Sequence, residues 1–175
     1  GLGDVYKRQA ADGYFYMYAT ESTRNVPIMK SKDLVEWTYC NTAFTNKTRP
    51  RFEPKAGIWA PDINYINGKY VLYYAMSVWG GEQTCGIGVA TADSPQGPFT
   101  DHGKMFRSNE IGVQNSIDPS FLQYEGRNYL VWGSFRGIYV IELTADGLSI
   151  MSGAKKKRIA GTAFEAVYIH KHGDY

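Results

Sequence analysis

The chain has 175 residues and a formal net charge of +2, which is enough length for one domain with a real core and too little charge to indicate a nucleic-acid partner. The longest strand-like apolar run covers only residues 70–76, so no membrane-spanning helix is predicted. Aromatic side chains make up 15% of the residues, including 14 tyrosines. Tyrosine favours β-strands, and aromatic faces can also stack on sugar rings, although packing within a sheet is the more common role.

Residues 1–9 fit no strand template well, and the chain does not begin with methionine. We expect this segment to be foreign to the folded domain. The domain is therefore placed at residues 10–175, as a part of a larger fold that is truncated at both ends.

Four glycines mark a repeated pattern in which a strand-like run leads into a turn and a tyrosine-rich strand follows. They are Gly13, Gly68, Gly126 and Gly173. They recur at intervals of about 50 residues, which is typical of propeller blades built from short strands. In the second unit the turn is Asn67-Gly68, a pair that favours the type I′ hairpin turn.

Three complete units follow in chain order. No segment has a convincing helical period, so the chain is predicted to be all-β, with about three propeller blades and the start of a fourth. A β-sandwich is the alternative all-β architecture, and the long repeat argues against it. The predicted strand-like runs are residues 14–20, 26–30 and 31–38 in the first unit, 63–66, 70–76, 85–91 and 99–100 in the second, and 121–124, 128–134 and 137–143 in the third.

Two acidic residues occupy equivalent points of successive units. Asp118 precedes Gly126 by eight residues, and Glu165 precedes Gly173 by eight residues. Equivalent positions in neighbouring blades can face one shared axis, and a pair of carboxylates across a pocket is what glycoside hydrolysis requires. Pro119 is expected to hold Asp118 in an extended conformation. The alternative for Asp118 alone is a turn residue that accepts a loop amide.

Other candidates depend more on their surroundings. Asp62 precedes an inner strand and is predicted to line the pocket, although an ordinary loop acid would look the same. Trp59, Trp79 and Phe135 could stack on sugar, and core packing is the common alternative for any one of them.

The two cysteines, Cys40 and Cys85, could pair or stay free. The histidines His102, His170 and His172 have no spacing typical of metal ligands, so no residue of the chain requires a metal or other cofactor.

Four motifs stand along the chain: Trp59-Ala60-Pro61-Asp62, Ser116-Ile117-Asp118-Pro119-Ser120, Phe164-Glu165-Ala166 and Ser31-Lys32-Asp33-Leu34-Val35-Glu36-Trp37. A further stretch is Gly133-Ser134-Phe135, followed by Gly137-Ile138-Tyr139. Together these motifs resemble glycoside hydrolase family 43 over about residues 10–175, and the further stretch resembles its arabinanase branch in particular.

The resemblance implies a five-bladed β-propeller with an axial active site that inverts the anomeric centre. Glu165 would be the general acid, and Asp118 the aspartate that orients and tunes it by like-charge repulsion. Asn115 and Trp59 would lie beside the sugar. The resemblance also implies that the intact protein is secreted or periplasmic and can hold a central calcium ion.

One departure from the family pattern concerns the general base, which is expected in an Asp-Pro motif of the first blade. Asp4 stands in that register, but Val5 replaces the proline. The base is therefore expected to lie outside this chain, and the fragment by itself is expected to be inactive.

The predicted function is inverting hydrolysis of α-1,5-linked L-arabinan, with a polysaccharide or oligosaccharide as partner and neither nucleic acid nor membrane. The alternatives are an exo-acting arabinofuranosidase or β-xylosidase of the same fold, and a carbohydrate-binding propeller without catalysis.

Overall fold

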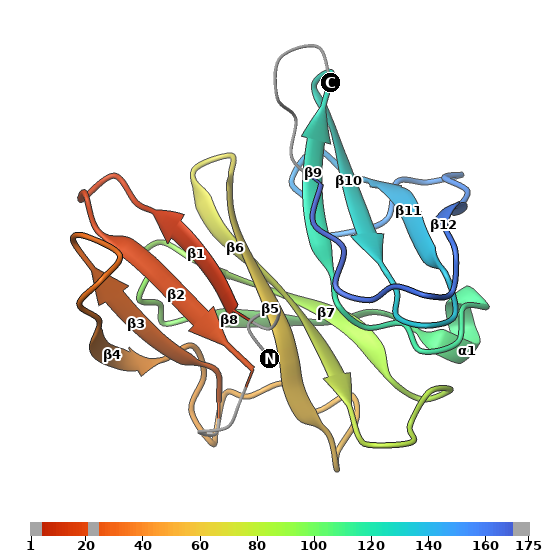
Figure 1. Cartoon of the computed structure of the whole chain (residues 1–175), viewed down its shortest axis with the longest axis horizontal. Coiled ribbons are helices and arrows are strands. Elements are labelled where there is room, and N and C mark those ends of the chain that lie inside the picture. Colours follow the sequence, from red (N-terminus) through yellow and green to blue (C-terminus); the bar gives the residue numbers. More distant parts are fainter. Residues whose placement is uncertain (1–4, 21–24, 170–175) are drawn as a thin grey trace.

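The computed structural model describes residues 5–20 and 25–169, with side chains from residue 10 onward. Its strands form three four-stranded antiparallel sheets, which we call blades 1 to 3 (Figure 1). In each blade the strands follow one another in chain order. Blade 1 consists of β1 (Val5–Gln9), β2 (Phe15–Ala19), β3 (Pro27–Ser31) and β4 (Thr38–Thr42).

Blades 2 and 3 repeat this meander. A single helical turn, α1 (Ser108–Ile111), follows blade 2, and no described helix is long and apolar enough to cross a membrane. Blade 2 consists of β5 (Gly57–Ile66), β6 (Lys69–Ser77), β7 (Gly86–Ala92) and β8 (Thr100–Arg107), and blade 3 of β9 (Ser120–Tyr124), β10 (Arg127–Trp132), β11 (Ile138–Leu143) and β12 (Lys157–Ala160).

The expectation that residues 1–9 fit no strand is wrong for residues 5–9. These residues form β1 and pair with β2 from Val5 opposite Ala19 to Gln9 opposite Phe15. The segment VYKRQ lacks a clear alternation of polar and apolar residues, so the sequence gives little strand signal. The backbone ladder to β2 supplies the pairing instead. Whether the segment is foreign in origin stays a prediction.

The first strands of the three blades lie next to one another. β5 contacts β1 on one side and β9 on the other. The outer strands of blades 1 and 3, β4 and β12, lie away from this line at the left and right of Figure 1. The ends of the inner strands are therefore where residues from different blades can meet.

Blade 2 is buried on both faces, which explains the continuous apolar sequence of β6. Successive strand residues point to opposite faces. Tyr74 accordingly packs in a core shared with blade 1, and Tyr73 in a core shared with blade 3. The Tyr74 hydroxyl donates to Asp101 Oδ1 at 2.6 Å, and the Tyr73 hydroxyl donates to the carbonyl of Gly147 at 2.7 Å. Burial raises the pKa of both phenols, which keeps them neutral donors.

The structure settles the alternative left open for the two cysteines, because both are free thiols. Cys40 is partly exposed, whereas Cys85 is buried with its Sγ 3.1 Å from the hydroxyl oxygen of Ser108.

We expect a thiol reagent to modify Cys40 in the native protein well before Cys85. Burial raises the pKa of both thiols, and only Cys85 is closed off from solvent. Mass spectrometry of alkylated peptides, taken before and after unfolding, measures the order. Equal rates at the two positions in the native protein would contradict this packing.

Candidate functional site

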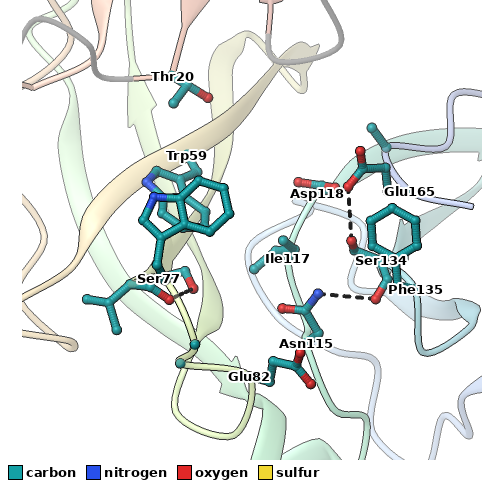
Figure 2. A pocket seen from close by; sticks show the side chains of 15 residues that line it. Thr20, Trp59, Ser77, Glu82, Asn115, Ile117, Asp118, Ser134, Phe135 and Glu165 are labelled. Carbon is teal, nitrogen blue, oxygen red and sulfur yellow. Dashed lines mark hydrogen bonds between the residues drawn. The ribbon is translucent and has the colours of Figure 1, made fainter. Parts of the chain in front are cut away.

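A cavity of about 620 Å³ opens where the ends of blades 2 and 3 meet. It is of the size that small-ligand sites have. Figure 2 shows Trp59 on one side of it, and Asp118, Glu165 and Phe135 on the other. The lining residues come from all three blades and from the segment after β12: Thr20, Trp59, Ser77, Val78, Trp79, Gly80, Gly81, Glu82, Asn115, Ile117, Asp118, Ser134, Phe135, Glu165 and Ala166.

The backbone around the cavity is unusually rich in left-handed conformations. Asn115, Asp118, Phe135 and Ala166 have φ values of 55°, 57°, 49° and 51°. Such conformations are uncommon for residues other than glycine and cluster at functional sites, where the surrounding structure holds them. Four of them on the walls of one cavity mark it as the candidate site.

Asp118 lies two residues before β9 and is 8% exposed. Its φ of 57° contradicts the extended conformation that Pro119 was expected to impose. The preference that proline places on its predecessor is a local one, and here it competes with tertiary contacts of the preceding residue: Ile117 packs with Ala75 and Cys85, and its carbonyl accepts the Gly133 amide. The turn brings Asp118 into the wall of the cavity.

Residues of the turn between β10 and β11 hold Glu165 in place through hydrogen bonds. The Ser134 hydroxyl donates to Glu165 Oε2 at 3.2 Å, and the two residues form an isolated β-bridge. The amide of Phe135 donates to the carbonyl of Phe164 at 2.9 Å, and Asn115 Nδ2 donates to the carbonyl of Ser134 at 3.2 Å. Figure 2 shows the two side-chain bonds as dashed lines. A small network therefore positions Glu165, and the predicted residue Asn115 belongs to it.

Aromatic rings face the cavity from both sides. Trp59 and Trp79 have ring centroids 5.4 Å apart, and Trp79 is 93% exposed. Phe135, 49% exposed, lies across from Trp59 (Figure 2). An apolar ring exposed to this extent gains little from packing. These rings can instead stack on the faces of a sugar chain.

Asp62 does not line the cavity, in contrast to the sequence prediction. It is 4% exposed, and its Oδ2 accepts bonds from Asn64 Nδ2 at 2.7 Å and from the amide of Phe121 at 2.8 Å. Asp62 therefore joins the inner strand of blade 2 to that of blade 3. A bulge shifts the register of β5 between Trp59 and Asp62, so that Trp59 lines the cavity and Asp62 does not. The sequence gives no sign of this bulge.

We expect Asp62→Ala to lower the free energy of unfolding by about 1–3 kcal/mol, since the Phe121 amide loses a charged acceptor. Urea denaturation measures this. Asp93→Ala is the matched control, because Asp93 lies in an exposed ion pair with Lys69 and its loss should cost little. Equal stabilities for the two variants would contradict the role assigned to Asp62.

Glu82 lines the cavity and was missed in the sequence, where it stands in a loop without any motif. Asp4, His170 and His172 lie outside the described residues. Over residues 10–20 and 25–169, no three His, Cys, Asp or Glu side chains gather to hold a metal ion. Calcium binding by the intact protein stays a prediction, and no step of the proposed reaction uses the ion.

Comparison with known proteins gives one consistent result. The family model of Glycosyl hydrolases family 43 matches residues 4–175. Probable arabinan endo-1,5-alpha-L-arabinosidase C of Neosartorya fischeri is 33% identical over 98% of this chain and 54% of its own length. The chain thus spans about half the length of the curated relatives it matches.

Solved structures agree with the sequence relatives. The alpha-L-arabinanase of Cellvibrio cellulosa superposes with a TM-score of 0.79 at 28% identity, over 90% of this chain and 53% of the other. An exo-1,5-alpha-L-arabinanase from a bovine ruminal metagenomic library gives a TM-score of 0.80 at 30% identity, over 97% of this chain and 62% of the other. The prediction of an all-β propeller is confirmed.

Proposed function

This chain belongs to glycoside hydrolase family 43, and we propose that the protein hydrolyses α-1,5-linked L-arabinan with inversion of the anomeric centre. The observation that carries the proposal is the presence of Asp118 and Glu165 in one cavity whose walls expose aromatic rings. Carboxylates provide the proton transfers of glycoside hydrolysis, and rings provide stacking surfaces for the sugar.

In this proposal Glu165 is the general acid. Its Oε2 accepts the Ser134 hydroxyl, which leaves Oε1 to carry the proton to the leaving oxygen of the glycosidic bond. Asp118 is the aspartate that orients and tunes Glu165 from the same wall. Trp59 and Asn115 would lie beside the bound sugar.

The general base of the proposal is a carboxylate that activates water on the opposite face of the sugar ring. An inverting pair needs its carboxyl groups about 6.5–9.5 Å apart so that the water fits between them. The family model begins its match at residue 4, and β1, which starts at Val5, contacts β5. Asp4 matches the register of the expected base in the sequence only and lies outside the described residues, so the base is expected from the part of the protein beyond this chain.

The test uses the chain extended to the full length of its relatives, incubated with linear arabinan. Proton NMR of the first products should show the anomeric configuration opposite to that of the substrate, and chromatography should show oligosaccharides before monomer. Linear xylan is the control substrate and should stay intact. Hydrolysis of xylan instead of arabinan, or products of retained configuration, would contradict the proposal.

Exo action is the second candidate, favoured by the similarity to the exo-1,5-alpha-L-arabinanase described above. The same time course separates the two modes, because an exo enzyme releases short products of one size from the beginning. An extracellular location is part of either proposal, since the substrate is a polymer found outside the cell.

A further inference from the structure

Glu82 connects three segments that line the cavity. It lies in the loop between β6 and β7, and its carboxylate accepts Arg136 Nε and Nη2, both at 3.1 Å. The same carboxylate accepts Gln114 Nε2 at 2.7 Å. The main-chain carbonyl of Glu82 accepts the amide of Asn115 at 2.7 Å. One residue thus ties the loop after β6 to the segment before β9 and to the turn after β10.

Each of these partners stands next to a residue of the candidate site. Arg136 follows Ser134 and Phe135 in the turn that holds Glu165. Gln114 and Asn115 begin the segment that ends in Asp118. The loop that carries Glu82 also carries Trp79, on the side of the cavity formed by blade 2. The contacts of Glu82 therefore connect the wall that carries Trp79 with the wall that carries Asp118 and Glu165. Figure 2 shows Glu82 next to Asn115.

Stability gives little reason for this arrangement. The side chains of Arg136 and Glu82 are 47% and 34% exposed, and ion pairs of that exposure contribute little to folding. A forked arginine–carboxylate pair does fix direction, because two parallel bonds define the plane of both groups. Its geometry suits positioning better than it suits stabilisation.

We propose that the Glu82–Arg136 pair is a strap that sets the distance between the two walls of the cavity, and that Glu82 and Arg136 are positioning residues. The role in catalysis rests on the proposed function, whereas the effect on the walls does not. When the pair is broken, the turn of residues 133–137 loses its direct tie to the loop of residues 78–82, and the two remain connected through Asn115, which donates hydrogen bonds to the Glu82 and Ser134 carbonyls. A sugar chain then meets Trp79 and Glu165 at the wrong separation, and misplacement of this kind lowers rates strongly.

The test compares Glu82→Gln, Arg136→Gln and the double variant in the extended chain. Each single variant should lower kcat/KM on arabino-oligosaccharides by about tenfold, and the double variant should be no worse than either single one, as for two residues in direct contact. Melting temperatures should stay close to that of the parent. Glu142→Gln is the matched control, because Glu142 forms a similar forked pair with Arg127 on β10 and β11 outside the cavity, and its kinetics should equal the parent's.

Arg136 does not line the cavity, which makes its variant decisive. If Glu82 acted on the substrate directly, Arg136→Gln would keep the parent's kinetics, and that result would overturn the strap. Additive losses in the double variant would overturn it as well.

A second readout needs no substrate. The NMR signals of the indole N–H groups of Trp59 and Trp79 should move in Glu82→Gln and stay in place in Glu142→Gln. If the parent protein fails to cleave arabinan, the proposed function is wrong. The indole signals still test whether the Glu82–Arg136 pair positions the two walls of the cavity. Unchanged indole signals in Glu82→Gln would overturn that role.

Discussion

Replacement of Glu165 by glutamine is expected to lower kcat on linear arabinan by about 10²–10⁴-fold, which is the usual contribution of a positioned general acid. Glutamine keeps the shape of the side chain and its contact with Ser134, but it has no acidic proton for the leaving oxygen. Binding of the sugar should change little, because the aromatic walls of the cavity remain. The measurement is steady-state hydrolysis of arabinan by the extended chain.

The leaving group provides the control for this prediction. An aryl arabinofuranoside with a strongly acidic phenol needs no proton to depart. The same variant should therefore retain far more of the parent's rate on that substrate than on arabinan. Equal losses on both substrates would contradict the role of Glu165 as the acid, and full activity on arabinan would exclude it from the reaction.

Trp132→Ala is expected to lower the free energy of unfolding by about 3–5 kcal/mol, as for other large buried aromatic residues. Trp132 is fully buried in the core between blades 2 and 3. Its ring lies 5.0 Å from Phe106 of blade 2 and 5.9 Å from Tyr139 of blade 3, measured between centroids. Its Nε1 donates to the hydroxyl of Ser116 at 3.0 Å, two residues before Asp118. Loss of this ring loosens both the contact between blades and the segment that carries the aspartate.

Two variants separate these contributions. Trp132→Phe retains much of the ring volume and removes the bond to Ser116, so it should cost less than Trp132→Ala. Trp79→Ala makes the same truncation at a ring that is 93% exposed, and its cost should stay within about 0.5 kcal/mol. Denaturant unfolding measures all three, and equal costs at positions 79 and 132 would contradict the burial described here.

The sequence contained enough information for the fold because turns and tyrosine strands repeat. The Asn67-Gly68 turn and the adjacent tyrosines of β6 predicted a hairpin, and the structure places Tyr73 and Tyr74 on opposite faces of blade 2. β1 was missed because residues 5–9 show no clear alternation of polar and apolar residues, and their pairing with β2 appears only in the structure. The chain accounts for three blades of the five-bladed propeller of its family.

The candidate site was predictable in part. The equal spacing of Asp118 and Glu165 ahead of their turn glycines predicted their meeting, since equivalent positions in neighbouring blades face the same opening. Asp62 also precedes an inner-strand segment, but a β-bulge lies just before it in β5. Its carboxylate accepts the Phe121 amide of blade 3 and so connects two blades instead of lining the cavity. Glu82 depends on tertiary partners in the segment before β9 and in the turn after β10, which no local pattern reveals.

A crystal structure of the extended Glu165→Gln variant with a bound arabino-oligosaccharide tests the central claim most directly. The account predicts a glycosidic oxygen within hydrogen-bonding distance of the side chain at position 165, with Asp118 on the same wall and a sugar ring against Trp59. A sugar chain bound elsewhere on the blades, or one whose glycosidic oxygens all lie out of reach of position 165, would contradict it.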